Sequence, residues 1–175
     1  MRTFGKVLGR ILLTLVIIIG LLYFFGPREK VDTIISFNNN SIGNNINLYL
    51  EKQESAYSDI TPGTERRIIW HGTKGIQTPV SVVVMHGFSA SSEEIRPVPD
   101  LVANELGANI YFMRFKGHGR DGVALSKANA GDWLEDTAEA MEIGRRIGEK
   151  VIVIGTSMGG TIATILAAST DLNRD

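Results

Sequence analysis

The sequence predicts an α/β domain with a mostly parallel sheet and helices on both faces, preceded by one N-terminal transmembrane helix. Three observations predict this arrangement. From residue 66 onward, short β-branched runs alternate with longer segments of helical spacing, which is the pattern of βαβ units. A glycine-flanked turn around one serine joins the last apolar strand to a helix, and a long uncharged run lies near the N-terminus.

Composition excludes several classes of site. The chain has 175 residues, about one domain, and 43% of them are hydrophobic, which is enough to build a core. The net charge of −1 gives no indication of a nucleic-acid partner. Because cysteine is absent, disulfides, thiolate metal sites and cysteine nucleophiles are excluded. The three histidines lack metal-binding spacing such as HExxH, so we expect neither a metal nor a cofactor.

An apolar run over residues 7–26 predicts a membrane anchor within residues 1–30. Twenty residues at 1.5 Å each cross about 30 Å of hydrocarbon, and only Arg10 interrupts the run. Aromatic residues 23–25 fit the far interface. The alternatives are a soluble helix or a cleaved secretory signal. An uncleaved anchor is favoured over the signal because a signal core is usually shorter and no A-x-A-like site follows.

Basic residues set the expected orientation of this anchor. Arg2, Lys6 and Arg10 precede the span, whereas Arg28 and Lys30 follow it together with Glu29. By the positive-inside rule, the N-terminus is expected in the cytoplasm. We therefore expect a single-pass protein of the cell membrane, with the remaining domain on the non-cytoplasmic side.

A polar linker is expected over residues 31–45, followed by the domain over residues 46–175. The segment FNNNSIGNNIN (37–47) is rich in asparagine, which favours turns over helices. Within the domain, we expect a Ser91–Glu94 capping box and a helix that is capped by Asp132. The helix at Asp132 is expected to run to residue 147, and further helices are expected over 46–57, from Pro97 or Pro99 to 105, and over 161–168. The pattern predicts strands over 66–72, 80–87, 109–113 and 151–154.

The turn Gly155-Thr156-Ser157-Met158-Gly159 matches G-x-S-x-G between a predicted strand and a predicted helix. In this context the motif indicates a nucleophilic serine, because a sharp turn that projects the side chain needs glycine on both sides. A P-loop would need a following lysine, and a dinucleotide-binding turn would need glycine at residue 157. The remaining alternative is a structural turn with an inert serine.

A second loop supplies candidate oxyanion donors. The sequence Met85-His86-Gly87-Phe88 ends the strand that we expect beside the serine's own strand. Acyl transfer needs two N–H groups directed at the developing oxyanion. The backbone amides of Phe88 and Met158 are the candidates.

Three motifs in order resemble the α/β-hydrolase family: HGFSAS (86–91), GHGRDG (117–122) and GTSMGG (155–160). The resemblance runs from about residue 46 to 170 and is closest to bacterial carboxylesterases and monoacylglycerol-lipase-like enzymes. It implies Ser157 as nucleophile and the Phe88 and Met158 amides as oxyanion hole. It also implies an acid after a later strand and a histidine near the C-terminus. A serine nucleophile argues against the branches that use aspartate.

The triad acid and histidine that the resemblance implies are missing from the chain. After Ser157 it offers only Asp171 and Asp175, and no histidine. The three histidines all come earlier and are expected in structural or surface roles: His71, His86 and His118. Both triad partners are therefore expected outside this chain, which we interpret as the N-terminal portion of a hydrolase domain.

Three other polar or aromatic residues are expected in structural roles. Asp121 and Asp132 are expected in a turn and a helix cap, and Trp133 in packing. The sequence thus predicts a membrane-anchored serine hydrolase that cleaves carboxylic esters, with a small acyl ester, and possibly a lipid ester, as substrate. The alternative is a catalytically inactive, truncated membrane-anchored remnant or interaction module. The motif does not distinguish esterase from lipase, thioesterase or peptidase.

Overall fold

The computed structural model describes residues 2–28 and 31–168, and the chain divides into two units at residue 31. The first unit holds α1 (Arg2–Phe25). Its segment Phe4–Phe25 is unburied and mainly apolar, with Lys6 and Arg10 as its only charged residues. The length and composition of this segment fit either a membrane span or a signal sequence near the N-terminus.

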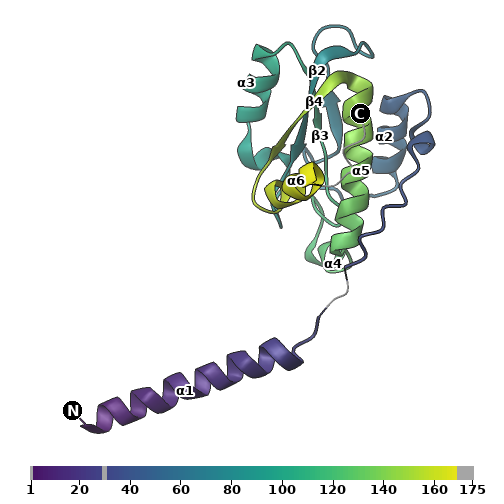
Figure 1. Ribbon diagram of the computed structural model, residues 1–175. Helices are drawn as coiled ribbons and strands as arrows, with labels where there is room; N and C mark the ends of the chain where they lie inside the picture. Colours follow the sequence, from purple (N-terminus) through teal and green to yellow (C-terminus); the bar gives the residue numbers. More distant parts are fainter. Residues whose placement is uncertain (1, 29–30, 169–175) are drawn as a thin grey trace. The chain divides into compact units, whose positions relative to one another are not determined.

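The second unit is an α/β domain (Figure 1). Its described elements are η1 (Asn39–Ile42), α2 (Ile46–Ser55), β1 (Arg67–Ile69), β2 (Thr78–Met85), η2 (Ser92–Ile95), α3 (Val98–Glu105), β3 (Asn109–Phe112), α4 (Gly122–Leu125), α5 (Ala130–Ile147), β4 (Gly148–Gly155) and α6 (Met158–Ala168).

The described strands form one sheet in the order β1-β3-β2-β4. Strand β2 pairs in parallel with both β3 and β4, and only β1 runs antiparallel to its neighbour. In this register Val83 lies opposite Tyr111 on one side and Val153 on the other. The mostly parallel α/β sheet and the pairing of the serine's strand with β2 are confirmed.

Strand β2 is apolar without alternation because both of its faces are covered. Val82 and Val84 pack in the cluster beneath α3, whereas Val83 and Met85 pack with the residues of α5. All four side chains are fully buried. Figure 1 shows α3 on one side of the sheet and α5 with α2 on the other. A strand buried on both faces reads as a continuous β-branched run, as the sequence does here.

The structure differs from the expected polar linker over residues 31–45. The Ser36 backbone N–H and hydroxyl both donate to Glu135 Oε1, at 2.6 and 2.8 Å. Ile42 is 3% exposed in the core, and Phe37 packs against the same cluster. The asparagine-rich composition predicts turns correctly, but the apolar residues between the asparagines fasten this segment to the domain.

Two helix starts lie three residues earlier than expected. Asn129, not Asp132, caps α5: its side chain accepts from the Asp132 N–H at 3.1 Å. The Asp132 carboxylate in turn accepts from the Asn129 N–H at 3.0 Å, and the two bonds together form a capping box in which Asp132 belongs to the first turn of the helix. Helix α6 begins at Met158 rather than at residue 161.

A buried ion network joins α2 to the strands and α5. Glu54 pairs with Arg66 at 2.7 Å and with Arg114 at 2.8 Å, and Arg66 also pairs with Glu139 at 2.7 Å. Burial alone would raise the pKa of the Glu54 carboxyl, but hydrogen bonds from Arg114 and Arg66 outweigh it and lower that pKa. The carboxylate is therefore held in its charged form.

We expect Glu54→Ala to destabilise the domain by about 3–5 kcal/mol, because it leaves the buried Arg114 guanidinium without a carboxylate and Arg66 with Glu139 alone. Chemical denaturation measures this loss. The matched control is Glu51→Ala on the exposed face of the same helix, expected to change stability by about 0.5 kcal/mol or less. Equal midpoints for the two variants would contradict the role assigned to the network.

Candidate active site

Ser157 lies in the turn between β4 and α6, with an exposed side chain and a φ of 49°. A non-glycine residue in this left-handed region costs on the order of 1 kcal/mol, and such strain occurs often at functional sites. Helix α6 starts directly behind the turn: the Thr161 N–H donates to the Ser157 carbonyl at 2.9 Å. The serine thus stands in front of a helix N-terminus, where negative charge is favoured.

The two glycines of the turn are required by close backbone approach. A Cβ at Gly159 would lie 2.2 Å from the Met85 carbonyl oxygen, and a Cβ at Gly155 would lie 2.6 Å from the Gly159 oxygen. The turn is therefore pressed against the end of β2, where no side chain fits.

The ends of β2 and β4 are joined at this point. The Thr156 N–H donates to the Met85 carbonyl at 3.0 Å, so the loops that follow both strands begin at the same edge of the sheet. Within the described residues, the Phe88 and Met158 amides donate to no protein acceptor. The structure thus brings the predicted nucleophile and both predicted amide donors to one edge, with the donors unoccupied.

The loop after β2 is held by two side chains. His86 Nδ1 lies 2.9 Å from the Gly87 carbonyl, and its Nε2 accepts from the Phe115 N–H at 3.2 Å. Glu94 Oε2 accepts from the Gly87 N–H at 2.8 Å. The predicted Ser91–Glu94 capping box is therefore wrong. Ser91 does cap η2, but the Glu94 carboxylate accepts from the Gly87 N–H seven residues earlier, a contact that the capping-box spacing does not indicate.

His118 lies buried beneath the same loop. Its Nδ1 lies 3.3 Å from the Lys116 carbonyl, and burial lowers the pKa of its imidazole. Within the described part of the chain, His118 Nε2 has no hydrogen-bond partner. The ring lies edge-on to Phe88 and Trp133, at centroid distances of 5.9 and 5.7 Å. Trp133 packs as expected, and its indole N–H donates to the Lys116 carbonyl.

His86 is held neutral, and this makes stability depend on pH. Burial lowers the pKa of His86 from 6.5 to about 4. A depressed histidine pKa gives stability that is fully present above pH 6.5 and is lost as the pH falls toward 4, because the unfolded chain binds the proton more tightly. At roughly 1.4 kcal/mol per unit, the loss is about 3 kcal/mol.

Denaturation midpoints measured between pH 7 and 4 check this expectation. His86→Asn is expected to have a shallower decline than the unmodified protein. The control is His71→Asn, at an exposed histidine, whose decline is expected to match the unmodified protein. Parallel curves for all three proteins would contradict a buried neutral His86.

In the described residues, no general base is hydrogen-bonded to the Ser157 hydroxyl. Both ring nitrogens of His86 are occupied by backbone groups, and the Ser157 hydroxyl has no hydrogen bond there. Asp121 caps α4 through the Ala124 N–H at 2.8 Å, and Asp132 pairs with the Lys116 ammonium. The late residues 171 and 175 lie outside the described part of the chain. Within that part, no cluster of three or more His, Asp or Glu side chains has the geometry of a metal site.

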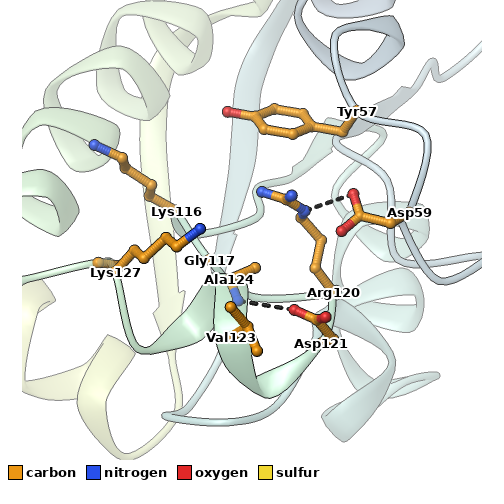
Figure 2. Close-up of a pocket in the computed structure, with 10 residues that line it drawn as sticks. Tyr57, Asp59, Lys116, Gly117, Arg120, Asp121, Val123, Ala124 and Lys127 are labelled. Carbon is orange, nitrogen blue, oxygen red and sulfur yellow. Dashed lines mark hydrogen bonds and ion pairs between the residues drawn. The ribbon is translucent and has the colours of Figure 1, made fainter.

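A pocket of about 390 Å³ opens beside the GHGRDG loop (Figure 2). Arg120 and Asp59 form an ion pair across it at 2.8 Å, and the side chains of Tyr57, Lys116 and Lys127 complete its rim. Its lining does not include Ser157, Phe88 or Met158. This pocket is therefore separate from the loops that carry the candidate nucleophile and amides.

The strand–turn–helix geometry around Ser157 agrees with a comparison against known families. The serine aminopeptidase S33 family matches residues 77–173, more than half of the chain. The chain belongs to this α/β-hydrolase family. The matched region includes β2, the loop after it, and the whole turn around Ser157.

Two relatives are lipolytic proteins. A thermostable monoacylglycerol lipase from Bacillus sp. (strain H-257) is 30% identical over 89 residues, which cover 51% of this chain and 35% of the lipase. A solved structure from a study of the metagenome-derived lipolytic enzymes LipS and LipT is 28% identical, with a TM-score of 0.53. That match covers 62% of this chain and 41% of the other. The chain thus spans about a third of the length of the curated relative.

Proposed function

We propose that this chain provides the nucleophile and oxyanion hole of a membrane-anchored serine hydrolase that cleaves carboxylic esters. The observation that carries the proposal is the conformation of Ser157: exposed, at φ 49°, at the carboxyl end of a parallel strand and in front of a helix. Membership of an α/β-hydrolase family and similarity to lipolytic relatives support an ester as substrate.

The proposed reaction proceeds through an acyl-enzyme. Ser157 Oγ attacks the carbonyl carbon of the ester while a histidine base takes the hydroxyl proton. The Phe88 and Met158 amides hold the oxyanion, and the leaving alcohol departs with the proton. Water then hydrolyses the acyl-enzyme and releases the carboxylic acid. We propose that the acid and the histidine of the triad lie outside these 175 residues.

A panel of substrates tests the reaction class. We expect the native protein to hydrolyse short- and medium-chain acyl esters, including monoacylglycerols, and to cleave aminoacyl anilides much more slowly. Faster cleavage of the anilides would overturn the ester assignment in favour of a peptidase, because both reactions use the same nucleophile and oxyanion hole.

A second candidate is a catalytically inactive, membrane-anchored remnant or interaction module. It is favoured by one observation: within the described residues, no histidine is hydrogen-bonded to the Ser157 hydroxyl. Without a base, the serine stays largely a neutral alcohol. This candidate predicts a stable native protein with no hydrolysis of any substrate in the panel and no covalent reaction with a fluorophosphonate.

We propose that residues 7–26 anchor the protein in the cell membrane in a single pass, with the domain on the non-cytoplasmic side. Extraction of cell membranes with alkaline carbonate tests the anchor. An uncleaved span is expected to leave the protein in the membrane pellet, because about twenty apolar residues are buried in lipid. Release into the supernatant, with an N-terminus beyond residue 26, would show a cleaved signal instead.

A further inference from the structure

We propose that His86 and Glu94 are positioning residues of the oxyanion hole: together they fix the two peptide groups that flank Gly87 and so orient the Phe88 amide. This inference rests on the proposed function, because it assigns the Phe88 N–H to the oxyanion. Neither side chain is expected to touch the substrate.

The first contact fixes the peptide that contains the Phe88 amide. The Gly87 carbonyl receives His86 Nδ1 at 2.9 Å and the Ala90 N–H at 3.3 Å. A peptide group is planar, and in the trans form its C=O and the following N–H point in opposite directions. Holding the Gly87 carbonyl therefore also sets the direction of the Phe88 N–H.

The hydrogen bonds of His86 are satisfied by one tautomer alone. Nδ1 faces a carbonyl, so it must carry the proton, and Nε2 faces the Phe115 N–H, so it must keep its lone pair. The ring is 1% exposed, and the rings of Phe115 and His118 lie 5.0 and 4.9 Å from it. His86 thus links the loop after β2 to the end of β3 through a neutral, immobile ring.

The second contact fixes the preceding peptide. Glu94 Oε2 accepts from the Gly87 N–H at 2.8 Å, and a Cβ at Gly87 would lie 3.1 Å from both carboxylate oxygens. A charged acceptor makes a stronger hydrogen bond than a neutral one. Both the N–H and the carbonyl of Gly87 are therefore fixed by side chains, although glycine is the residue type with the greatest backbone freedom.

Such preorganisation acts on the transition state. Donors that are already directed at the oxyanion need no reorganisation when the charge develops, and loss of one donor in such a hole costs about 10²–10³-fold in kcat. A loosened Phe88 amide is expected to lose part of this effect. Because the amide is proposed to meet the oxyanion and not the ground-state substrate, kcat falls while KM stays nearly constant.

Two variants of His86 separate its two contacts. The Asn side chain places an N–H donor near the position of Nδ1, whereas the longer Gln side chain places an acceptor near the position of Nε2. We expect His86→Asn to keep kcat for ester hydrolysis within about threefold and His86→Gln to lower it about tenfold or more, with KM unchanged in both. Equal losses in the two variants, or no loss in either, would overturn the assignment for His86.

Glu94 offers a matched pair of the same kind. Glu94→Gln keeps an acceptor oxygen and is expected to retain most of the activity. Glu94→Met has a similar length without an acceptor, and kcat is expected to fall about tenfold at constant KM. Full activity in Glu94→Met would overturn the role of Glu94.

A spectroscopic readout separates failure of this inference from failure of the proposed function. In the full protein labelled with ¹⁵N-histidine, the His86 ring is expected to show a protonated Nδ1 and an unprotonated Nε2, and His86→Asn assigns the signals by their loss. The opposite tautomer overturns the positioning role whether or not the protein is active. If the tautomer is as expected but Ser157 accepts no acyl group, the proposed function fails while the geometry of the loop stands.

Discussion

Ser157→Ala is expected to lower the rate of ester hydrolysis by about 10⁴-fold or more. The remaining rate would be a small residual catalysis by the oxyanion hole and substrate binding. The change removes the only atom that forms the acyl-enzyme, while the Phe88 and Met158 amides stay in place. Initial rates on a short-chain ester, measured with purified protein in detergent, check this expectation.

The matched control is Ser126→Ala. Ser126 is also exposed, and its hydroxyl donates to the Val123 carbonyl, at 2.9 Å. We expect this variant to keep full activity. Undiminished hydrolysis in Ser157→Ala would show that the reaction uses another nucleophile and would overturn the function assigned to the turn.

Gly159→Ala is expected to have the second largest effect. The new methyl carbon would lie 2.2 Å from the Met85 carbonyl oxygen, a backbone atom that cannot move aside alone. The turn must then move away from the end of β2, which breaks the 3.0 Å bond between the Thr156 N–H and that same carbonyl. We expect a loss of stability of about 3 kcal/mol or more, the upper part of the range for overpacking, together with loss of activity.

Gly122→Ala provides the control for this substitution. A Cβ at Gly122 meets no atom within 4 Å, and its φ does not require glycine. Chemical denaturation is expected to show a change of about 1 kcal/mol or less for this variant, in either direction. A Gly159→Ala protein as stable as Gly122→Ala would mean that the turn does not approach β2 as closely as described.

The sequence predicts the sheet well because burial on both faces leaves a clear local pattern. The runs 80–87 and 151–154 are apolar and β-branched, and the structure places them as neighbouring parallel strands. The turn around Ser157 is also predictable because G-x-S-x-G between a strand and a helix is a local pattern, although Gly159 is required by its approach to the distant Met85 carbonyl. Here the local signal and the tertiary structure agree.

Other features depend on partners outside the segment itself and have no local signal. Glu94 was expected in a helix cap, but its carboxylate satisfies the Gly87 N–H in a different segment. The segment after residue 31 was expected as a polar linker, yet Ser36 bonds to Glu135, ninety-nine residues later. Composition and spacing describe a segment on its own, so they cannot show which distant group it contacts.

Covalent labelling of the native protein with a fluorophosphonate, followed by peptide mapping and intact mass, tests the central claim most directly. The reagent reacts with a serine that is activated by a base and faces an oxyanion hole. We predict one adduct, on the peptide that contains Ser157, and an intact mass larger than that of these 175 residues, because the triad acid and histidine are proposed to lie outside them. An unmodified protein, or an adduct on any other residue, would contradict the assignment of Ser157 as the nucleophile of an active hydrolase.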